Sequence, residues 1–253
     1  MPGGDPIRDL QVFIDERWAV AQPKFYPSIA EGPGVPAEVT PSEAAWFLDC
    51  VTARGDEPPL LVVDDDRKER SDRYPRLSGG APRGYLFFEE PGRLRLETIV
   101  GWAAVARLRD EFGWPREHLV CESPTLLMDG REILRYEALD ILALEEQCAE
   151  PPAQMHVQAA RSHAGAEAKA TPRMLEKLLA GMRACQTDGT PHSRSDHVKC
   201  SAIAVLRPRL FLGVAAAETW RLFNVVERDG RAVLGDELPD LDRLRFAAMS
   251  EPA

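Results

Sequence analysis

The chain has 253 residues, of which 44% are hydrophobic and 28% are charged, a composition typical of one large folded domain or a core with an extension. Its formal net charge of -10 argues against a protein that coats nucleic acid, and no apolar run reaches the ~18 residues of a membrane helix. The N-terminus lacks the order of a signal peptide, in which basic residues precede an apolar run. The five cysteines are an odd number without close pairs in the sequence, which fits a reducing compartment. We therefore expect a cytoplasmic protein without a membrane contact.

The first part of the chain, residues 1–93, is expected to be an irregular N-terminal extension with a few short elements, because it is rich in proline. Ser42 is a candidate N-cap for a helix that ends at Gly55. The stretch "PPLLVVDDD" is typical of a short strand. The extension could recognise a substrate, cover a site or mediate the formation of a homodimer.

Residues 94–230 are predicted to form a mixed α/β domain. Apolar residues recur at helical spacing from Leu96 to Leu108, Asp129-Gly130 predicts a hairpin, and residues 137–144 are typical of a buried strand. A strand at 155–170, a helix that begins at Thr171 and Pro172, a helix at 197–208 and two strands at 209–230 should follow. This order predicts a partly antiparallel sheet flanked by helices, with residues 231–253 as a C-terminal tail.

The predicted strand that ends at Lys169 has one face of small residues and one charged face. Side chains alternate across a strand, so Ala164, Ala166 and Ala168 share one face, on which a helix could pack closely. Glu167 and Lys169 lie side by side on the other face. A solvent-exposed edge strand would not need two faces that differ so sharply.

Asp140 is the one acid in the middle of an otherwise apolar predicted strand, "YEALDILAL". A buried carboxylate is costly without a cation, hydrogen-bond donors or a metal. If this strand runs beside that of Glu167, the two carboxylates converge and suit a hard divalent cation such as Mg²⁺. The metal would activate a water for attack on a phosphodiester, and Lys169 could orient that water or stabilise the developing charge.

These residues resemble the PD-(D/E)xK nuclease superfamily, the restriction-endonuclease-like fold of restriction enzymes and RecB-type nuclease domains. The resemblance covers about residues 94–226 and rests on Asp140 in "EALDIL", on "AEAKA" with Glu167 and Lys169, and on the helix "TPRMLEKLLAGM" that follows. It implies a metal-dependent nuclease acting on DNA, with Mg²⁺ (or Mn²⁺) held by Asp140 and Glu167, and with Lys169 as the catalytic lysine. Glu97, at the start of the helix before the hairpin, stands where many members carry an accessory catalytic acid.

Other interpretations of the same residues stay open. Leu139 stands where the family motif has Pro, and the interval between Asp140 and the Glu-x-Lys triplet is long. Asp140 could pair with Arg135, the Glu-x-Lys pair could be a surface salt bridge, and Glu97 could simply stabilise the start of its helix. The choice between DNA and RNA is open as well. The alternative function is a catalytically inactive nuclease-fold protein that acts as a binding or interaction module.

Two further features lie in the second half of the chain. Residues 161–209 contain nine Lys or Arg and four Asp or Glu, so that 9 - 4 = +5, and this basic segment could touch phosphate. Cys185, His192, His197 and Cys200 could form a tetrahedral zinc site. Their spacing is not that of a standard finger, and we prefer a polar loop with a half-buried cysteine in each flanking helix. His197 and Lys199 could instead approach phosphate.

Overall fold

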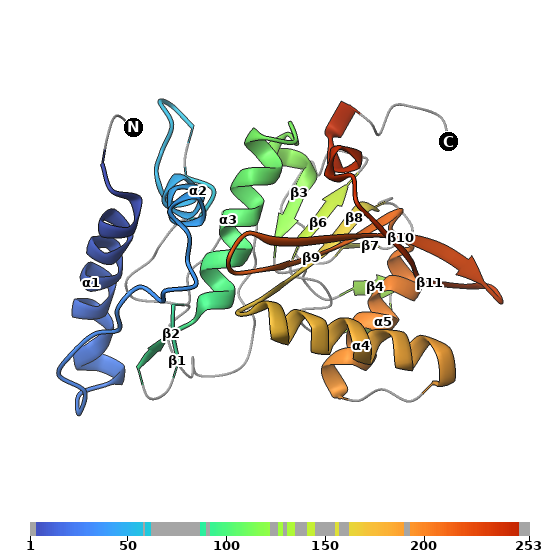
Figure 1. The fold of residues 1–253 in the computed structure, drawn as a ribbon, viewed down its shortest axis with the longest axis horizontal. Coiled ribbons are helices and arrows are strands. Elements are labelled where there is room, and N and C mark those ends of the chain that lie inside the picture. Colours follow the sequence, from blue (N-terminus) through green and yellow to red (C-terminus); the bar gives the residue numbers. More distant parts are fainter. Residues whose placement is uncertain are drawn as a thin grey trace.

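The structure is a computed structural model that describes residues 4–57, 59–61, 87–89, 92–121, 126–128, 131–134, 141–144, 155–156, 162–189 and 193–247. Within these ranges the chain forms an α/β fold, in which helices lie on both sides of a mixed β-sheet (Figure 1). The class of fold expected from the sequence, a mixed sheet flanked by helices, is therefore confirmed. In the same ranges, no helix is both long and apolar enough to cross a membrane.

The central sheet has six strands in the order β11-β10-β9-β8-β6-β3. Among these neighbours β8 and β9 are parallel, and the other pairs are antiparallel. A parallel pair needs a long crossover connection, which helices α4 and α5 supply between β8 and β9. The strands are β3 (Leu119–Cys121), β6 (Ile141–Leu144), β8 (Ser162–Lys169), β9 (Leu210–Ala215), β10 (Thr219–Arg228) and β11 (Arg231–Leu238).

Two smaller sheets and two 3-10 helices accompany the central sheet. Met128 at the end of β4 pairs with Arg131 at the start of β5, which confirms the predicted hairpin, while its Asp129-Gly130 turn lies outside the described residues. The remaining elements are β1 (Phe88–Glu89), β2 (Arg93–Leu94), β4 (Leu126–Met128), β5 (Arg131–Leu134), β7 (Met155–His156) and the 3-10 helices Arg116–His118 and Leu241–Leu244.

The N-terminal residues form two helices, α1 (Pro6–Phe25) and α2 (Pro41–Val51), in the part of the chain expected to be irregular. Helix α1 was not predicted from the sequence, although Leu10, Ile14 and Trp18 recur every fourth residue and are buried. The buried side chains of both helices belong to the same hydrophobic core as those of β8 and β9. The N-terminal helices are therefore packed onto the α/β part of the molecule (Figure 1).

Helix α2 begins earlier than the sequence analysis predicts. Its N-cap is Thr40, with Pro41 at the first position, so the expectation that Ser42 is the N-cap is wrong. The Thr40 hydroxyl accepts from the Glu43 amide, and the Glu43 carboxylate accepts from the Thr40 amide, which completes a capping box. Residues 59–61 of the strand expected in "PPLLVVDDD" are not in a strand, and its other residues lie outside the described ranges.

Helix α3 (Leu96–Asp110) packs on the alanine face of β8, as the sequence predicts. Ala164, Ala166 and Ala168 are all buried in the core that α3 shares. A Cβ atom placed on Gly101 would lie 3.4 Å from Cβ of Ala168, so the absence of a side chain lets the helix approach the strand closely. Small residues on both partners thus bring α3 directly onto the strand that carries the Glu-x-Lys triplet.

Helices α4 (Pro172–Asp188) and α5 (Arg194–Leu206) cover the opposite face of the sheet. Thr171 caps α4 and Pro172 occupies its first position, as predicted, because the Thr171 hydroxyl accepts from the Met174 amide. A second hydrophobic core lies between these helices and strands β9–β11. Strand β11 extends the sheet into residues 231–238, where the sequence analysis expects a tail.

Glu43 joins the N-terminal helices to the turn between β9 and β10. One carboxylate oxygen accepts from the Glu218 amide at 2.9 Å, and the other accepts from the Thr40 amide at 2.9 Å. Glu218 has a positive φ of 52°, which a residue with a side chain adopts only when its surroundings hold it there. The buried Glu43 carboxylate therefore stabilises both a helix start and a strained turn.

We predict that Glu43→Ala lowers the free energy of unfolding by about 1–3 kcal/mol, because it removes two part-buried hydrogen bonds to backbone amides. Urea unfolding followed by circular dichroism measures the change. Glu31→Ala, at an exposed position, is the control and should stay within about 0.5 kcal/mol of wild type. Equal effects of the two substitutions would contradict this role for Glu43.

Candidate active site

Glu167 lies near the C-terminal end of β8, on the face opposite to the alanines, and is only 1% exposed. Its Oε1 atom lies 2.9 Å from Nζ of Lys169, two residues further along the strand. The same oxygen lies 2.9 Å from Nζ of Lys199, which α5 contributes. A carboxylate at this depth is stable in its ionised form only with such close cations. The predicted Glu167–Lys169 pair is present, with Glu167 buried and Lys169 partly exposed.

Neighbouring strands and α4 enclose this carboxylate. In the register of the parallel pair, Glu167 lies beside Gly213 of β9, and Lys169 lies beside Ala215. A Cβ atom on Gly213 would lie 2.7 Å from a methyl group of Leu175, so α4 rests directly on the strand next to Glu167. The helix and the sheet exclude water from the carboxylate, whereas the side chain of Lys169 keeps 16% of its surface exposed. Access from solvent is therefore at Lys169.

Asp140, the second predicted ligand, lies outside the described residues. Ile141, the next residue in the chain, is the first residue of β6 and pairs with Ala166, the residue before Glu167. Because β6 and β8 are antiparallel neighbours, the start of β6 lies beside the end of β8. The two strands therefore run side by side, as convergence of the two carboxylates requires, and the position of Asp140 stays a prediction.

Glu97 lies in the first turn of α3 and is partly exposed. One helical turn rises about 5.4 Å, so Glu97 precedes the Gly101–Ala168 contact by roughly one turn. This end of α3 lies near the end of β8 that leads into α4 (Figure 1). However, α3 packs on the alanine face, whereas Glu167 is on the opposite face. The structure thus brings together Glu167 and Lys169, and it sets Glu97 on the other side of the same strand end.

Lys199 is the residue of this cluster that the sequence analysis does not include among the expected site residues. It lies in "HVKCSAIAVL", where its neighbours in the helix are mostly apolar, and its side chain is 6% exposed. Lysine is almost never fully buried unless it is paired. A lysine in an otherwise apolar stretch therefore indicates a buried carboxylate partner. The sequence alone does not identify Glu167 as that partner.

The two cysteines of the proposed zinc cluster are neighbours in the second core. Cys200 is buried and donates to the carbonyl oxygen of Met182 at 3.4 Å. Burial raises the pKa of the Cys200 thiol, and the adjacent Cys185 thiol raises it further. His197 is exposed, and His192 lies outside the described residues. Among the residues that the structure describes, no group of three or more His, Cys, Asp or Glu could hold a metal ion.

The charges of the cluster bear on what it could bind. Glu167 contributes -1, and Lys169 and Lys199 contribute +2, so the described cluster carries a net charge of +1. An anionic group such as phosphate is thus favoured, and a bare cation requires a further acid, the role expected of Asp140. Carboxylate oxygens from one or two residues, completed by water, are the ligands that Mg²⁺ prefers. Glu167 and the predicted ligand Asp140 would together supply such oxygens, although Oε1 of Glu167 already contacts two ammonium groups.

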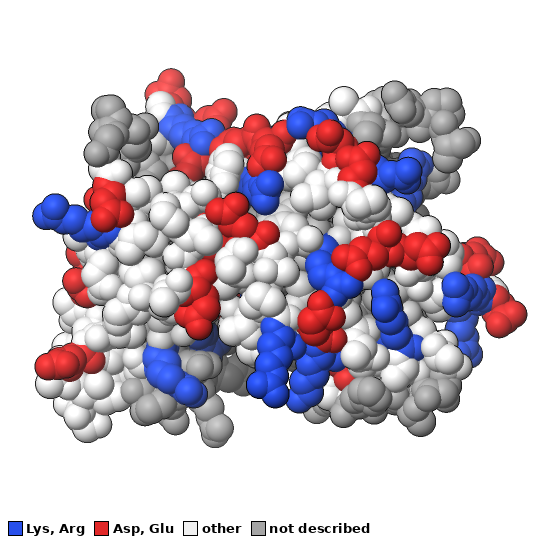
Figure 2. All heavy atoms as spheres, in the orientation of Figure 1, with Lys and Arg blue, Asp and Glu red and all other residues white. Residues whose placement is uncertain are grey.

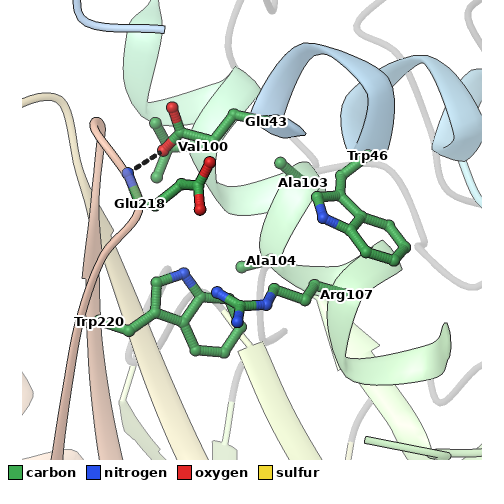
Figure 3. Close-up of a pocket in the computed structure, with 8 residues that line it drawn as sticks. All are labelled: Glu43, Trp46, Val100, Ala103, Ala104, Arg107, Glu218 and Trp220. Atoms are coloured by element: carbon green, nitrogen blue, oxygen red, sulfur yellow. Dashed lines mark hydrogen bonds between the residues drawn. The ribbon is translucent and has the colours of Figure 1, made fainter. Parts of the chain in front are cut away.

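A separate small pocket lies between α2, α3 and the β9–β10 turn (Figure 3). Its volume of about 20 Å³ holds roughly one water molecule. The Arg107 guanidinium carbon lies 4.4 Å from the ring centroid of Trp220 and closes one side. The lining residues are Glu43, Trp46, Val100, Ala103, Ala104, Arg107, Glu218 and Trp220. This pocket is too small for a substrate, and Glu43 already uses both carboxylate oxygens there.

No protein-family model matches the chain, and comparison with curated proteins and with solved structures gave no match. The function is therefore inferred from the chemistry of the cluster itself. That chemistry consists of one deeply buried carboxylate, one lysine at the solvent boundary and one buried lysine from a crossover helix.

We predict that Glu167→Gln lowers the free energy of unfolding by about 3–5 kcal/mol, because it removes the buried carboxylate that the Lys169 and Lys199 ammonium groups contact. Lys169→Met should cost less, since Lys169 is partly exposed and solvent screens its interaction. The double variant Glu167→Gln/Lys199→Met should regain part of the loss in urea unfolding. A double variant less stable than Glu167→Gln alone would contradict the pairing.

The raised pKa of Cys200 predicts a pH dependence of stability. Above about pH 8.5 the thiol loses its proton in the unfolded chain but keeps it in the folded protein. Stability is therefore unaffected below that pH, and it falls by up to about 1.4 kcal/mol per pH unit above it. Urea unfolding from pH 7 to 10 should show a steeper decline for wild type than for Cys200→Ala. Parallel declines would contradict the buried, protonated thiol.

Proposed function

We propose that the protein is a metal-dependent nuclease that hydrolyses phosphodiester bonds in DNA, with a restriction-endonuclease-like domain of the PD-(D/E)xK type. The observation that carries the proposal is the pair of Glu167 and Lys169, which lie two residues apart at the end of a central strand and are in contact at 2.9 Å. A carboxylate and an ammonium on the same strand face are the groups that such hydrolysis needs in one place.

The order of the elements supports the proposal. Helix α3 is followed by the central-sheet strands β3, β6 and β8, of which β6 is antiparallel to the other two. Helices α4 and α5 then lead to β9, which is parallel to β8. The PD-(D/E)xK resemblance rests on a helix, an acidic strand and a Glu-x-Lys strand that runs directly into a helix. In this chain α4 begins at Pro172, three residues after Lys169, and covers the face on which Glu167 lies.

In the proposed reaction, Asp140 and Glu167 would hold a Mg²⁺ ion. Ile141, the residue after Asp140, belongs to the core on the α3 side and pairs with Ala166, the residue before Glu167. When bound, Mg²⁺ would polarise a phosphate oxygen and lower the pKa of the attacking water. Lys169, at the solvent boundary, would donate to a phosphate oxygen and stabilise the charge that develops there.

The exposed face of α4 supports a polyanionic substrate. Arg173, Lys177 and Arg183 are exposed on this helix, and the acid Glu176 is exposed as well. Figure 2 shows Lys and Arg side chains along the lower part of this face of the molecule, where Figure 1 places α4. Because α4 starts directly after β8, phosphates bound along the helix would lead toward Lys169.

The burial of Glu167 favours a second candidate function. The carboxylate is 1% exposed, and two ammonium groups contact the same oxygen. A nuclease-fold protein that acts only as a binding or interaction module would need no access to this carboxylate, and a closed ion-pair network would stabilise its fold. This candidate shares the fold of the first one and differs from it in metal binding and cleavage.

We expect the purified protein to cleave DNA in the presence of Mg²⁺ or Mn²⁺ and not in EDTA. Lys169→Met should lower the cleavage rate by about 10²–10³-fold, because it removes a donor to the reacting phosphate. Asp140→Asn should have a similar effect. Lys24→Met, at an exposed lysine in α1 and away from the basic face of α4, is the matched control and should retain activity within a few-fold. Supercoiled plasmid, linear duplex, single-stranded DNA and RNA are compared as substrates.

Calorimetry with Mn²⁺ separates the two candidate functions. Wild type should bind Mn²⁺, and Asp140→Asn should bind it at least about tenfold more weakly. Absence of cleavage on every substrate, together with absence of Mn²⁺ binding, would overturn the nuclease and favour the non-catalytic module. Cleavage of RNA alone would keep the reaction and change the substrate.

A further inference from the structure

Helix α5 gives Glu167 a second lysine that the proposed reaction does not use. We propose that Lys199 is a positioning residue of the site, which fixes the Glu167 carboxylate so that Lys169 is left to act on the phosphate. The inference rests on the proposed function for its kinetic consequence. The positioning itself is a structural property that can be measured without any substrate.

Two ammonium groups contact Oε1 of Glu167. Nζ of Lys169 and Nζ of Lys199 both lie 2.9 Å from this atom, one from the strand itself and one from the helix layer. A single ammonium leaves a carboxylate able to rotate about its last torsion, which is broad and roughly two-fold. A second donor from a different element removes that freedom. The orientation of Glu167 is thus set jointly by β8 and α5.

The two lysines differ in their exposure to solvent. The side chain of Lys199 is 6% exposed, whereas that of Lys169 is 16% exposed. Lys199 is therefore too deep to reach a DNA phosphate, and its ammonium group contacts Glu167. When Lys169 turns toward a phosphate, Lys199 still neutralises the buried carboxylate. Lys199 would thus neutralise Glu167 while Lys169 contacts the phosphate, and a single lysine could not do both at the same time.

Helix α5, which carries Lys199, is capped at its start and packed against α4. The Ser193 hydroxyl accepts from the Asp196 amide at 3.2 Å and fixes the start of the helix. Asp196 is buried, and a Cβ atom on Gly181 would lie 2.4 Å from its carboxylate, so α5 packs tightly on α4. Ile203, one turn after Lys199, is fully buried in the second core. Lys199 therefore extends from a fixed base.

The experiment compares wild type with Lys199→Met, Lys199→Arg and Ile203→Val. Lys199→Met keeps the length of the side chain and removes its charge, whereas Lys199→Arg keeps the charge. Ile203→Val is the control for packing, because it removes one methylene group from a buried side chain of the same helix, at a cost of about 0.5–1.5 kcal/mol, and changes no charge. Lys199→Gln replaces Lys199→Met if the latter does not fold.

The first readout is the NMR signal of the Glu167 carboxyl carbon in protein labelled with [δ-¹³C]glutamate, assigned with Glu167→Gln. We expect this signal to shift or split in Lys199→Met, to stay near its wild-type position in Lys199→Arg, and to be unchanged in Ile203→Val. The same signal in wild type and Lys199→Met would overturn the positioning role, whether or not the protein cleaves DNA.

The second readout is the kinetics of DNA cleavage. Lys199→Met should lower kcat by about 10–100-fold, as expected for a misplaced catalytic group, with KM for DNA within about twofold of wild type. Lys199→Arg should restore most of the loss. If wild type cleaves DNA and Lys199→Met has the same kcat, the inference fails. If wild type is inactive but the NMR signal responds as expected, the proposed function fails and the positioning role stands.

Discussion

A carboxylate that is almost completely removed from water has to be matched by positive charge at contact distance, and Glu167 imposes this requirement on the fold around it. One match comes from its own strand and is nearly independent of the rest of the chain. The other comes from Lys199, and it requires α5 to pack over the sheet where Nζ of Lys199 can contact Oε1 of Glu167. The layer of α4 and α5 is thereby tied to the sheet by an ionic contact as well as by its apolar core.

The topology follows from this arrangement. Because β8 and β9 are parallel, the chain has to return across one face of the sheet, and the return is long enough to contain both α4 and α5. The alanine face of β8 carries no charge, and its small side chains let α3 pack closely at Gly101. The strand is thus apolar and close-packed on one side, and charged on the other.

Most of the secondary structure could be predicted because its signals are local. Helices α3 and α4 and strands β9 and β10 follow from strong periodicity and from Thr171 with Pro172 at a helix start. The N-cap of α2 was misassigned because Thr40 and Ser42 both have capping side chains. Thr40 is selected by Glu43, which stands three residues later and also accepts from the distant Glu218 amide. That last contact has no signature near either residue.

The sequence by itself determined that Glu167 and Lys169 share one strand face and that three alanines share the other, because the two-residue period of a strand is a property of the backbone. It also determined the helix that follows. Only the tertiary structure decided that this face is buried and that Lys199 contacts Glu167. The physical reason is that burial and long-range ion pairs depend on how whole elements pack, which a local pattern does not contain.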